Sequence, residues 1–193
     1  MSLVDRAKNI IMTPKTEWPV IAGEEPAMGQ IITAYVIPLA LISTIASIVG
    51  FGIFGRSFSW GIAMGLVQLV TAVVGVYVTA FVIDFLAPNF GSQKNIGRSV
   101  QLVAYSFTPV WVAGVFYIVP ALGILVLIAG LYGLYLLYLG LPVLMNTPQD
   151  KTIGYLVVSI IVIILVYWVI SMILTAIFLG IFGLSSLTMM QGM

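Results

Sequence analysis

Uncharged and strongly apolar stretches occupy most of this 193-residue chain, and short segments that carry its charges separate them. A helix rises about 1.5 Å per residue, so roughly 20 apolar residues are needed to cross about 30 Å of hydrocarbon. Four uncharged stretches are long enough to matter here. The stretch from Ser99 to Gln149 can hold two such helices, and each of the other three uncharged stretches can hold one. We therefore predict five transmembrane helices, near residues 29–54, 60–86, 100–118, 121–145 and 153–179.

Prolines divide and shape these predicted helices. Because proline ends a helix and glycine permits a turn, Pro120 and Gly123 mark the break between the third and fourth helices. Pro38, Pro109 and Pro142 lie within spans, where each leaves a backbone carbonyl without its usual partner. We interpret these three as structural kinks, with helices that line a cavity as the alternative.

The residues before the first predicted span have a pattern of their own. Ser2 can cap a helix, and Asp5 stands at the matching position three residues later. The apolar residues that follow at helical spacing are Leu3, Val4, Ala7, Ile10 and Ile11. This pattern predicts a short amphipathic helix that lies on the membrane surface or, alternatively, binds a partner.

Composition excludes a soluble globular protein. Hydrophobic residues make up 62% of the chain and charged residues 7%, and the mean hydropathy is +1.21. A soluble domain carries roughly 25% charged residues, because its surface must be solvated. We predict an all-α, polytopic transmembrane bundle, divided into an N-terminal cytoplasmic segment (1–28), a five-span domain (29–183) and a short C-terminal tail (184–193).

The distribution of basic residues predicts the orientation. Lys94, Arg98 and Lys151 share one side of the membrane with the basic residues of the N-terminal segment, whereas Arg56 stands alone on the other side. Cytoplasmic loops carry an excess of Lys and Arg. The N-terminus is therefore predicted to be cytoplasmic and the C-terminus periplasmic or extracellular. Lys94, Arg98 and Lys151 become candidate contacts on the cytoplasmic loops.

Asp84 is the only ionisable residue that falls within a predicted span, close to its cytoplasmic end. A carboxylate is costly in hydrocarbon and less costly near the interface. Asp84 could be a solvated acid at a helix end, form a salt bridge with Lys94 or Arg98, or belong to a polar pocket. The candidate residues for that pocket are Asp84, Gln101, Tyr105, Thr108, Tyr132 and Tyr135.

Small residues recur at four-residue spacing in the first two spans. Such pairs allow helix backbones to approach closely. We interpret them as packing within one bundle, with homodimerisation as the alternative. The pairs are Ser43 and Ser47, Ala46 and Gly50, and Gly61 and Gly65.

The chain lacks the residues that most membrane enzymes require. It has no His and no Cys, which removes His-ligated zinc sites, Ser-His pairs and thiolate nucleophiles. Its aspartates are only Asp5, Asp84 and Asp150, and no Gly-rich phosphate loop is present. We predict a protein that is not an enzyme and takes no metal or cofactor. The net charge of +1 also indicates no nucleic-acid partner.

Several motifs resemble the Yip family (Ypt-interacting proteins), in its compact prokaryotic form. One is the opening Leu3–Ile10 leading to Pro14–Trp18, and a second is Ala87–Lys94 followed by Ala104–Pro109. A third is Leu134–Pro142 followed by Asn146–Pro148 and Lys151. The resemblance covers essentially the whole chain and implies five transmembrane helices with a cytoplasmic N-terminus in a bacterial inner membrane.

The resemblance implies an architecture more than a mechanism. Eukaryotic relatives are linked to Rab GTPases through a longer N-terminal region, which carries an acidic-Tyr-Gly-Pro motif that this chain lacks. Binding to a Rab-type GTPase therefore does not transfer. We predict a non-enzymatic scaffold or adaptor that acts through its cytoplasmic face, in the lipid bilayer with another membrane protein or a second copy of itself. The alternative is a small-solute or lipid transporter or channel whose pocket surrounds Asp84.

Overall fold

The computed structural model describes residues 1–54 and 58–191. Within these ranges, the side chains that are not described are those of Trp60, Pro120, Ile170, Ser171 and residues 173–191. Throughout the described ranges the regular elements are helical, and no strand occurs there. Arg56, which the orientation argument used, lies outside the described residues.

Within the described ranges, five helical segments are long and apolar enough to cross a membrane, as predicted. The first spans Met28–Phe54 and comprises α3 (Met28–Ile31), a π-helical turn (Ile32–Val36) and α4 (Ile37–Phe54). The second, Gly61–Phe90, lies in α5 (Phe58–Leu86) and the 3₁₀ turn Ala87–Phe90. The third, Ile96–Ile118, comprises α6 (Ile96–Ser106), α7 (Thr108–Ala113) and a 3₁₀ turn (Gly114–Ile118). After a 3₁₀ turn (Pro120–Leu122), the fourth is α8 (Gly123–Leu144), and the fifth is Gln149–Val169 within α9 (Gln149–Gln191).

Three prolines lie within these helical segments, and the backbone changes at two of them, Pro38 and Pro109. Pro38 has no N–H and its ring would clash with the carbonyl four residues earlier. The helix widens just before it, because the N–H of Ile37 donates to the carbonyl of Ile32. Pro109 occupies the first turn of α7, where an N–H would have no helical partner, and separates α7 from α6. Pro142 lies inside α8.

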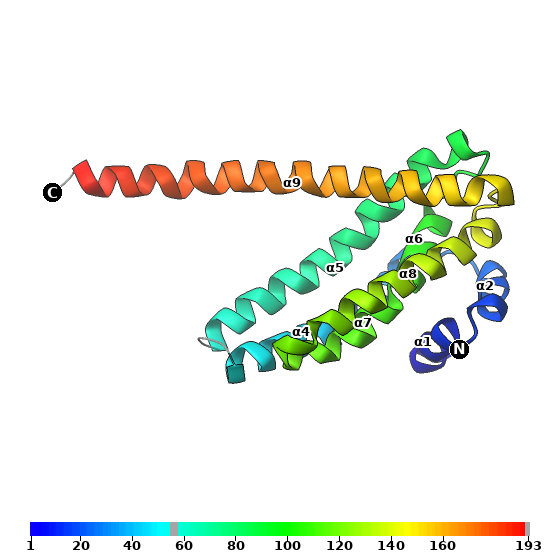
Figure 1. Ribbon diagram of the computed structural model, residues 1–193, viewed down its shortest axis with the longest axis horizontal. Helices are drawn as coiled ribbons and strands as arrows, with labels where there is room; N and C mark the ends of the chain where they lie inside the picture. Colours follow the sequence, from blue (N-terminus) through cyan, green and yellow to red (C-terminus); the bar gives the residue numbers. More distant parts are fainter. Residues whose placement is uncertain (55–57, 192–193) are drawn as a thin grey trace.

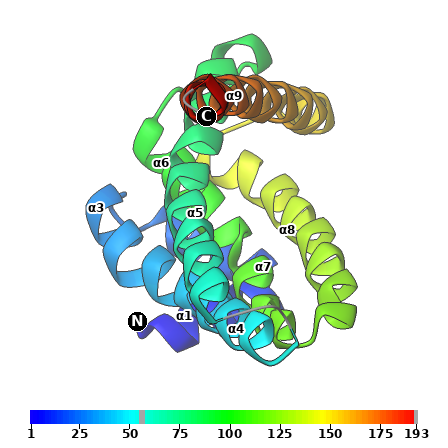
Figure 2. The same cartoon turned by 90° about the vertical axis from the view of Figure 1, so that its left-hand side faces the viewer.

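The third span is the most buried of the five, and α9 the least. The helix α6 contacts α3, α5 and α8, so it forms the centre of the bundle. Figure 2 shows α3 and α8 on opposite sides of the molecule. The first part of α9 contacts α5 and α8, and Figure 1 shows its remainder projecting beyond the other helices. The helix α9 ends at Gln191.

Small residues pack the spans against one another inside a single chain. A Cβ atom at Gly65 would lie 2.8 Å from the side chain of Ile48, so α5 approaches α4 closely at this point. A Cβ at Gly50 would lie 2.8 Å from the carbonyl oxygen of Ile118. The hydroxyl of Ser47 donates to Gln68 at 2.7 Å. These contacts favour the interpretation of the small pairs as internal packing.

The first two helices form a hairpin, which we call the N-terminal hairpin: α1 (Leu3–Met12) and α2 (Pro14–Ala22). Ser2 caps α1 by accepting from the N–H of Asp5 at 3.1 Å, as its spacing predicts. The side chains of Ile10, Trp18 and Ile21 are fully buried. They are covered because α1 packs on α6 and α7 and α2 packs on α8. On the apolar face of α1, Ala7 and Ile10 therefore meet the chain's own bundle, where the pattern alone suggested lipid or a partner, whereas Val4 is exposed.

Candidate functional site

Two loops join into one surface at the end of the bundle where α5 meets α6 and α8 meets α9 (Figure 1). We call residues 90–98 and 145–151 the loop platform. The N–H of Gln93 donates to the carbonyl of Met145 at 2.8 Å, and the amide of Asn146 donates to the side chain of Gln93 at 2.8 Å. The hydroxyl of Ser92 donates to that of Thr147 at 2.8 Å. These bonds hold the two loops as a unit.

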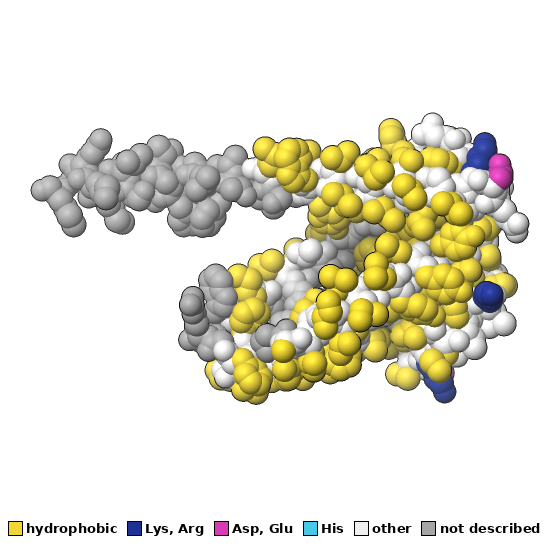
Figure 3. Space-filling model, viewed as in Figure 1, with side chains coloured by type: hydrophobic (Ala, Val, Ile, Leu, Met, Phe, Trp, Pro, Cys, Tyr) yellow, Lys and Arg dark blue, Asp and Glu magenta, His cyan; other side chains and the backbone are white. Residues whose placement is uncertain are grey.

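The basic side chains of the loop platform have different surroundings. Lys94 and Lys151 are exposed. Figure 3 shows the charged side chains of that view along the edge of the molecule that carries the start of α9 and the N-terminal hairpin. Arg98 instead turns inward. Its guanidinium donates to the carbonyl of Glu24 and to the side chain of Gln101, both at 2.8 Å. Arg98 therefore ties α6 to the segment that follows the N-terminal hairpin.

Asp84 lies apart from the other candidate pocket residues. It is 6% exposed, and one of its carboxylate oxygens is buried without a hydrogen bond in the described part of the chain. The salt bridge with Lys94 or Arg98, one of the three alternatives for Asp84, does not occur among the described residues. Lys94 points to solvent and Arg98 bonds Glu24 and Gln101.

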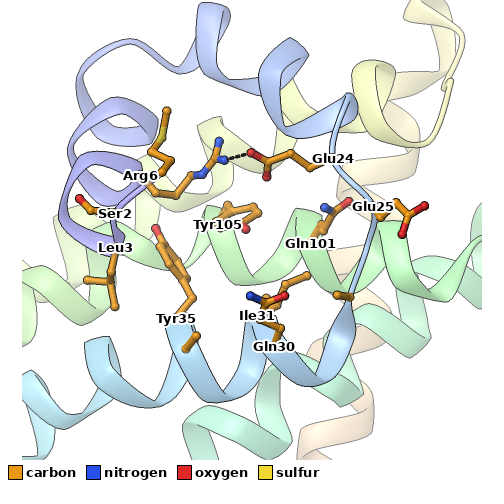
Figure 4. Close-up of a pocket in the computed structure, with 13 residues that line it drawn as sticks. Ser2, Leu3, Arg6, Glu24, Glu25, Gln30, Ile31, Tyr35, Gln101 and Tyr105 are labelled. Carbon is orange, nitrogen blue, oxygen red and sulfur yellow. Dashed lines mark hydrogen bonds and ion pairs between the residues drawn. The ribbon is translucent and has the colours of Figure 1, made fainter.

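A polar cavity of about 390 Å³ lies between the N-terminal hairpin, the start of the first span and α6 (Figure 4). We call it the hairpin pocket. Of the predicted pocket residues, Gln101 and Tyr105 line it. Thr108 does not line the pocket, but its hydroxyl shares a 2.8 Å hydrogen bond with the hydroxyl of Tyr35, which does. The other lining residues include Ser2, Leu3, Arg6, Glu24, Glu25, Gln30 and Ile31.

Arg6 is the main residue of this pocket that the sequence did not identify. It pairs with both Glu17 and Glu24, and its guanidinium carbon lies 5.5 Å from the centre of the Tyr105 ring. Arg6 is 5% exposed and Glu17 4%, so Asp84 is not the only buried charge. A signal existed: Arg6 is four residues before Ile10, on the apolar stripe of α1.

Tyr132 and Tyr135 contact the hairpin at other points. The hydroxyl of Tyr132 donates to the carbonyl of Ile11, near the end of α1, at 2.6 Å. Tyr135 is half-exposed and lines a separate hollow with residues of the turn between α1 and α2, among them Thr13. The structure therefore brings Gln101, Tyr105 and Thr108 together and places Tyr132 and Tyr135 elsewhere. Tyr132 acts as a link that holds α1 to α8.

These sites offer polar and charged groups that can bind a ligand. In the described ranges, no three Asp or Glu side chains gather as a metal site. The hairpin pocket offers carboxylates, amides and aromatic rings, and the loop platform offers exposed amines. Such groups form hydrogen bonds and ion pairs with a ligand.

The five spans with a docked N-terminal hairpin define a polytopic, all-helical membrane protein. The model of the Yip1 domain matches residues 8–171, so the chain belongs to the Yip1-domain family. The chain is also similar to the inner membrane protein YohC of Escherichia coli strain K12 and of Escherichia coli O6:H1. In each case 26% of 155 residues are identical, covering 74% of this chain and 80% of the relative. No solved structure matches. The resemblance drawn from the sequence motifs is thereby confirmed.

Proposed function

We propose that this Yip1-domain protein is a non-enzymatic scaffold or adaptor that binds a partner protein through the loop platform. The observation that carries the proposal is the set of hydrogen bonds joining Ser92 and Gln93 to the loop after α8. A surface that is ordered before binding loses less conformational entropy when a partner docks. Lys94 and Lys151 suit a partner with acidic groups at its contact surface.

The proposal includes a location. The loop platform faces the cytoplasm, because Lys94 and Lys151 belong to the side that carries most of the basic residues. The named relatives are inner membrane proteins, which supports the same membrane for this chain. A transporter centred on Asp84 has less support, since Asp84 does not line the pocket that contains Gln101 and Tyr105.

Site-specific photo-crosslinking in cells tests the proposal. A photoreactive amino acid replaces Lys94 in one variant and Lys151 in a second. A third variant carries it at Ala121, an exposed residue of the 3₁₀ turn that precedes α8 at the opposite end. We expect the first two variants to yield an adduct with the same protein and the third to yield none with that protein. Adducts from Lys94 and Lys151 that contain only lipid or a second copy of the chain would contradict the adaptor role.

A further inference from the structure

The hairpin pocket has a charge pattern that the adaptor role does not use. We propose that it binds a primary ammonium group, carried by an aminophospholipid headgroup or by a free small amine. The inference is independent of the loop platform, because the two sites share no exposed residue. It rests on the arrangement of charges, on one unpaired hydroxyl and on the position of the pocket along the spans.

The charges on the pocket wall favour a cationic ligand. Both terminal nitrogens of Arg6 are already bound to carboxylates, one to Glu17 and one to Glu24, and the side chain is buried. Glu24 remains 42% exposed, and Glu25 is exposed and forms no ion pair in the described part of the chain. Arg98 reaches the backbone carbonyl of Glu24 rather than its carboxylate. Acidic groups therefore exceed available basic groups on this wall.

The acidic side chains stand on one side of the pocket. Figure 4 shows Ser2 and Leu3 across the pocket from Glu24 and Glu25. An ammonium group is therefore expected to bind on the side of Glu24 and Glu25.

Tyr105 supplies the second observation. It is 7% exposed, and its hydroxyl makes no hydrogen bond within the described residues. Figure 4 places its side chain between Arg6, Tyr35 and Gln101, toward the middle of the pocket. Its ring meets that of Tyr35 edge-on, with centroids 4.8 Å apart. Because Tyr105 lines the pocket, its hydroxyl oxygen can accept a hydrogen bond from an N–H of a primary ammonium. A quaternary ammonium has no N–H to donate.

The pocket also has a suitable volume for a lipid headgroup and a suitable position along the membrane spans. Its volume of about 390 Å³ falls in the range of small-molecule sites. It is lined by Glu24 to Tyr35, where the first span begins, and by Gln101, near the start of the third span. The ends of membrane spans lie at the level of the lipid headgroups. A phosphatidylethanolamine headgroup could therefore enter while its acyl chains stay in the hydrocarbon.

Native mass spectrometry of the purified full-length protein tests the inference. The probes are dioleoyl phosphatidylethanolamine and dioleoyl phosphatidylcholine, which differ in whether the ammonium can donate hydrogen bonds. We expect occupancy by the ethanolamine lipid to be about tenfold higher, as for one charge-assisted hydrogen bond. Glu25→Gln and Tyr105→Phe should each reduce that preference. Asp150→Asn removes an equivalent charge at the loop platform and should leave the preference unchanged.

Free ethanolamine distinguishes the two sources of the ammonium group. Millimolar ethanolamine is added to the parent protein and to Glu25→Gln, each with bound lipid. If ethanolamine displaces the lipid from the parent protein but not from Glu25→Gln, the pocket takes a free amine. If it does not displace the lipid, the pocket requires the headgroup together with its phosphate. Equal occupancy by the two lipids, or a preference that persists in both pocket variants, would overturn the inference. Thermal unfolding of each variant at the parent's temperature verifies that the fold is intact.

Discussion

Arg6 holds the N-terminal hairpin together from inside, and its replacement provides the sharpest test of the fold. The side chains of Arg6 and Glu17 are 6% and 5% exposed, so their ion pair is shielded from water. The change Arg6→Gln removes the cation and leaves the Glu17 carboxylate buried without a charged partner. Breaking a buried pair in this way costs about 3–5 kcal/mol.

Glu24 provides a control within the same cluster. Its side chain is 42% exposed, so water solvates and screens its pair with Arg6. We expect Glu24→Gln to cost about 0–1 kcal/mol. The double change Arg6→Met with Glu17→Met should recover most of the loss of Arg6→Gln, because replacing both members of a buried pair with apolar residues is often close to neutral.

Cysteine labelling measures how often the hairpin leaves the bundle. The chain contains no Cys, so Ala7→Cys, at a buried position of α1, is a single reporter that changes the side chain little. A loss of about 3 kcal/mol in docking corresponds to roughly hundredfold faster reaction with a maleimide. If Arg6→Gln leaves the labelling rate unchanged, or if Glu24→Gln raises it equally, the buried Arg6–Glu17 pair does not hold the hairpin in place.

Three further predictions concern single contacts, each measured by thermal or denaturant unfolding of the purified protein. Tyr132→Phe removes the bond to the carbonyl of Ile11 and should destabilise by about 1 kcal/mol, with faster labelling of the hairpin reporter; unchanged labelling would contradict the link between α1 and α8. Gly114→Val should destabilise the protein by about 1–3 kcal/mol, because even a Cβ atom at this position would overlap a neighbouring helix. Gly123→Val is the control: its side chain would enter open space and should have little effect on stability. Asp84→Asn should be neutral or stabilise by about 1 kcal/mol, since it removes a buried charge without an ion pair in the described residues; a clear loss of stability would show that the carboxylate has a partner.

The spans could be predicted from the sequence because their signal is local. Each uncharged interval has the length of a membrane crossing, and the break at Pro120 and Gly123 falls where α8 begins. The cap formed by Ser2 is equally local, since it depends on a residue three positions away. The mean hydropathy of a segment and the spacing of its prolines require no knowledge of neighbouring helices.

The site could be predicted only in part, because its contacts join distant segments. Tyr105 and Gln101 share one face of α6 at helical spacing, so the sequence placed them together. Arg6 meets Glu24 only because a turn at Thr13 folds α1 back along α2. Asp84 was assigned to the same pocket by its depth alone, and depth does not specify which direction a side chain faces around a helix.

We expect the loop platform to face the cytoplasm, where it can bind a partner. A membrane-impermeant maleimide applied to intact cells tests it with two single-cysteine variants of this cysteine-free chain. One carries Lys94→Cys on the platform, and the other carries Ala121→Cys at the opposite end of the bundle, both at exposed positions. We expect Ala121→Cys to be labelled in intact cells and Lys94→Cys to be labelled only after the membrane is permeabilised. Labelling of Lys94→Cys in intact cells would contradict this expectation.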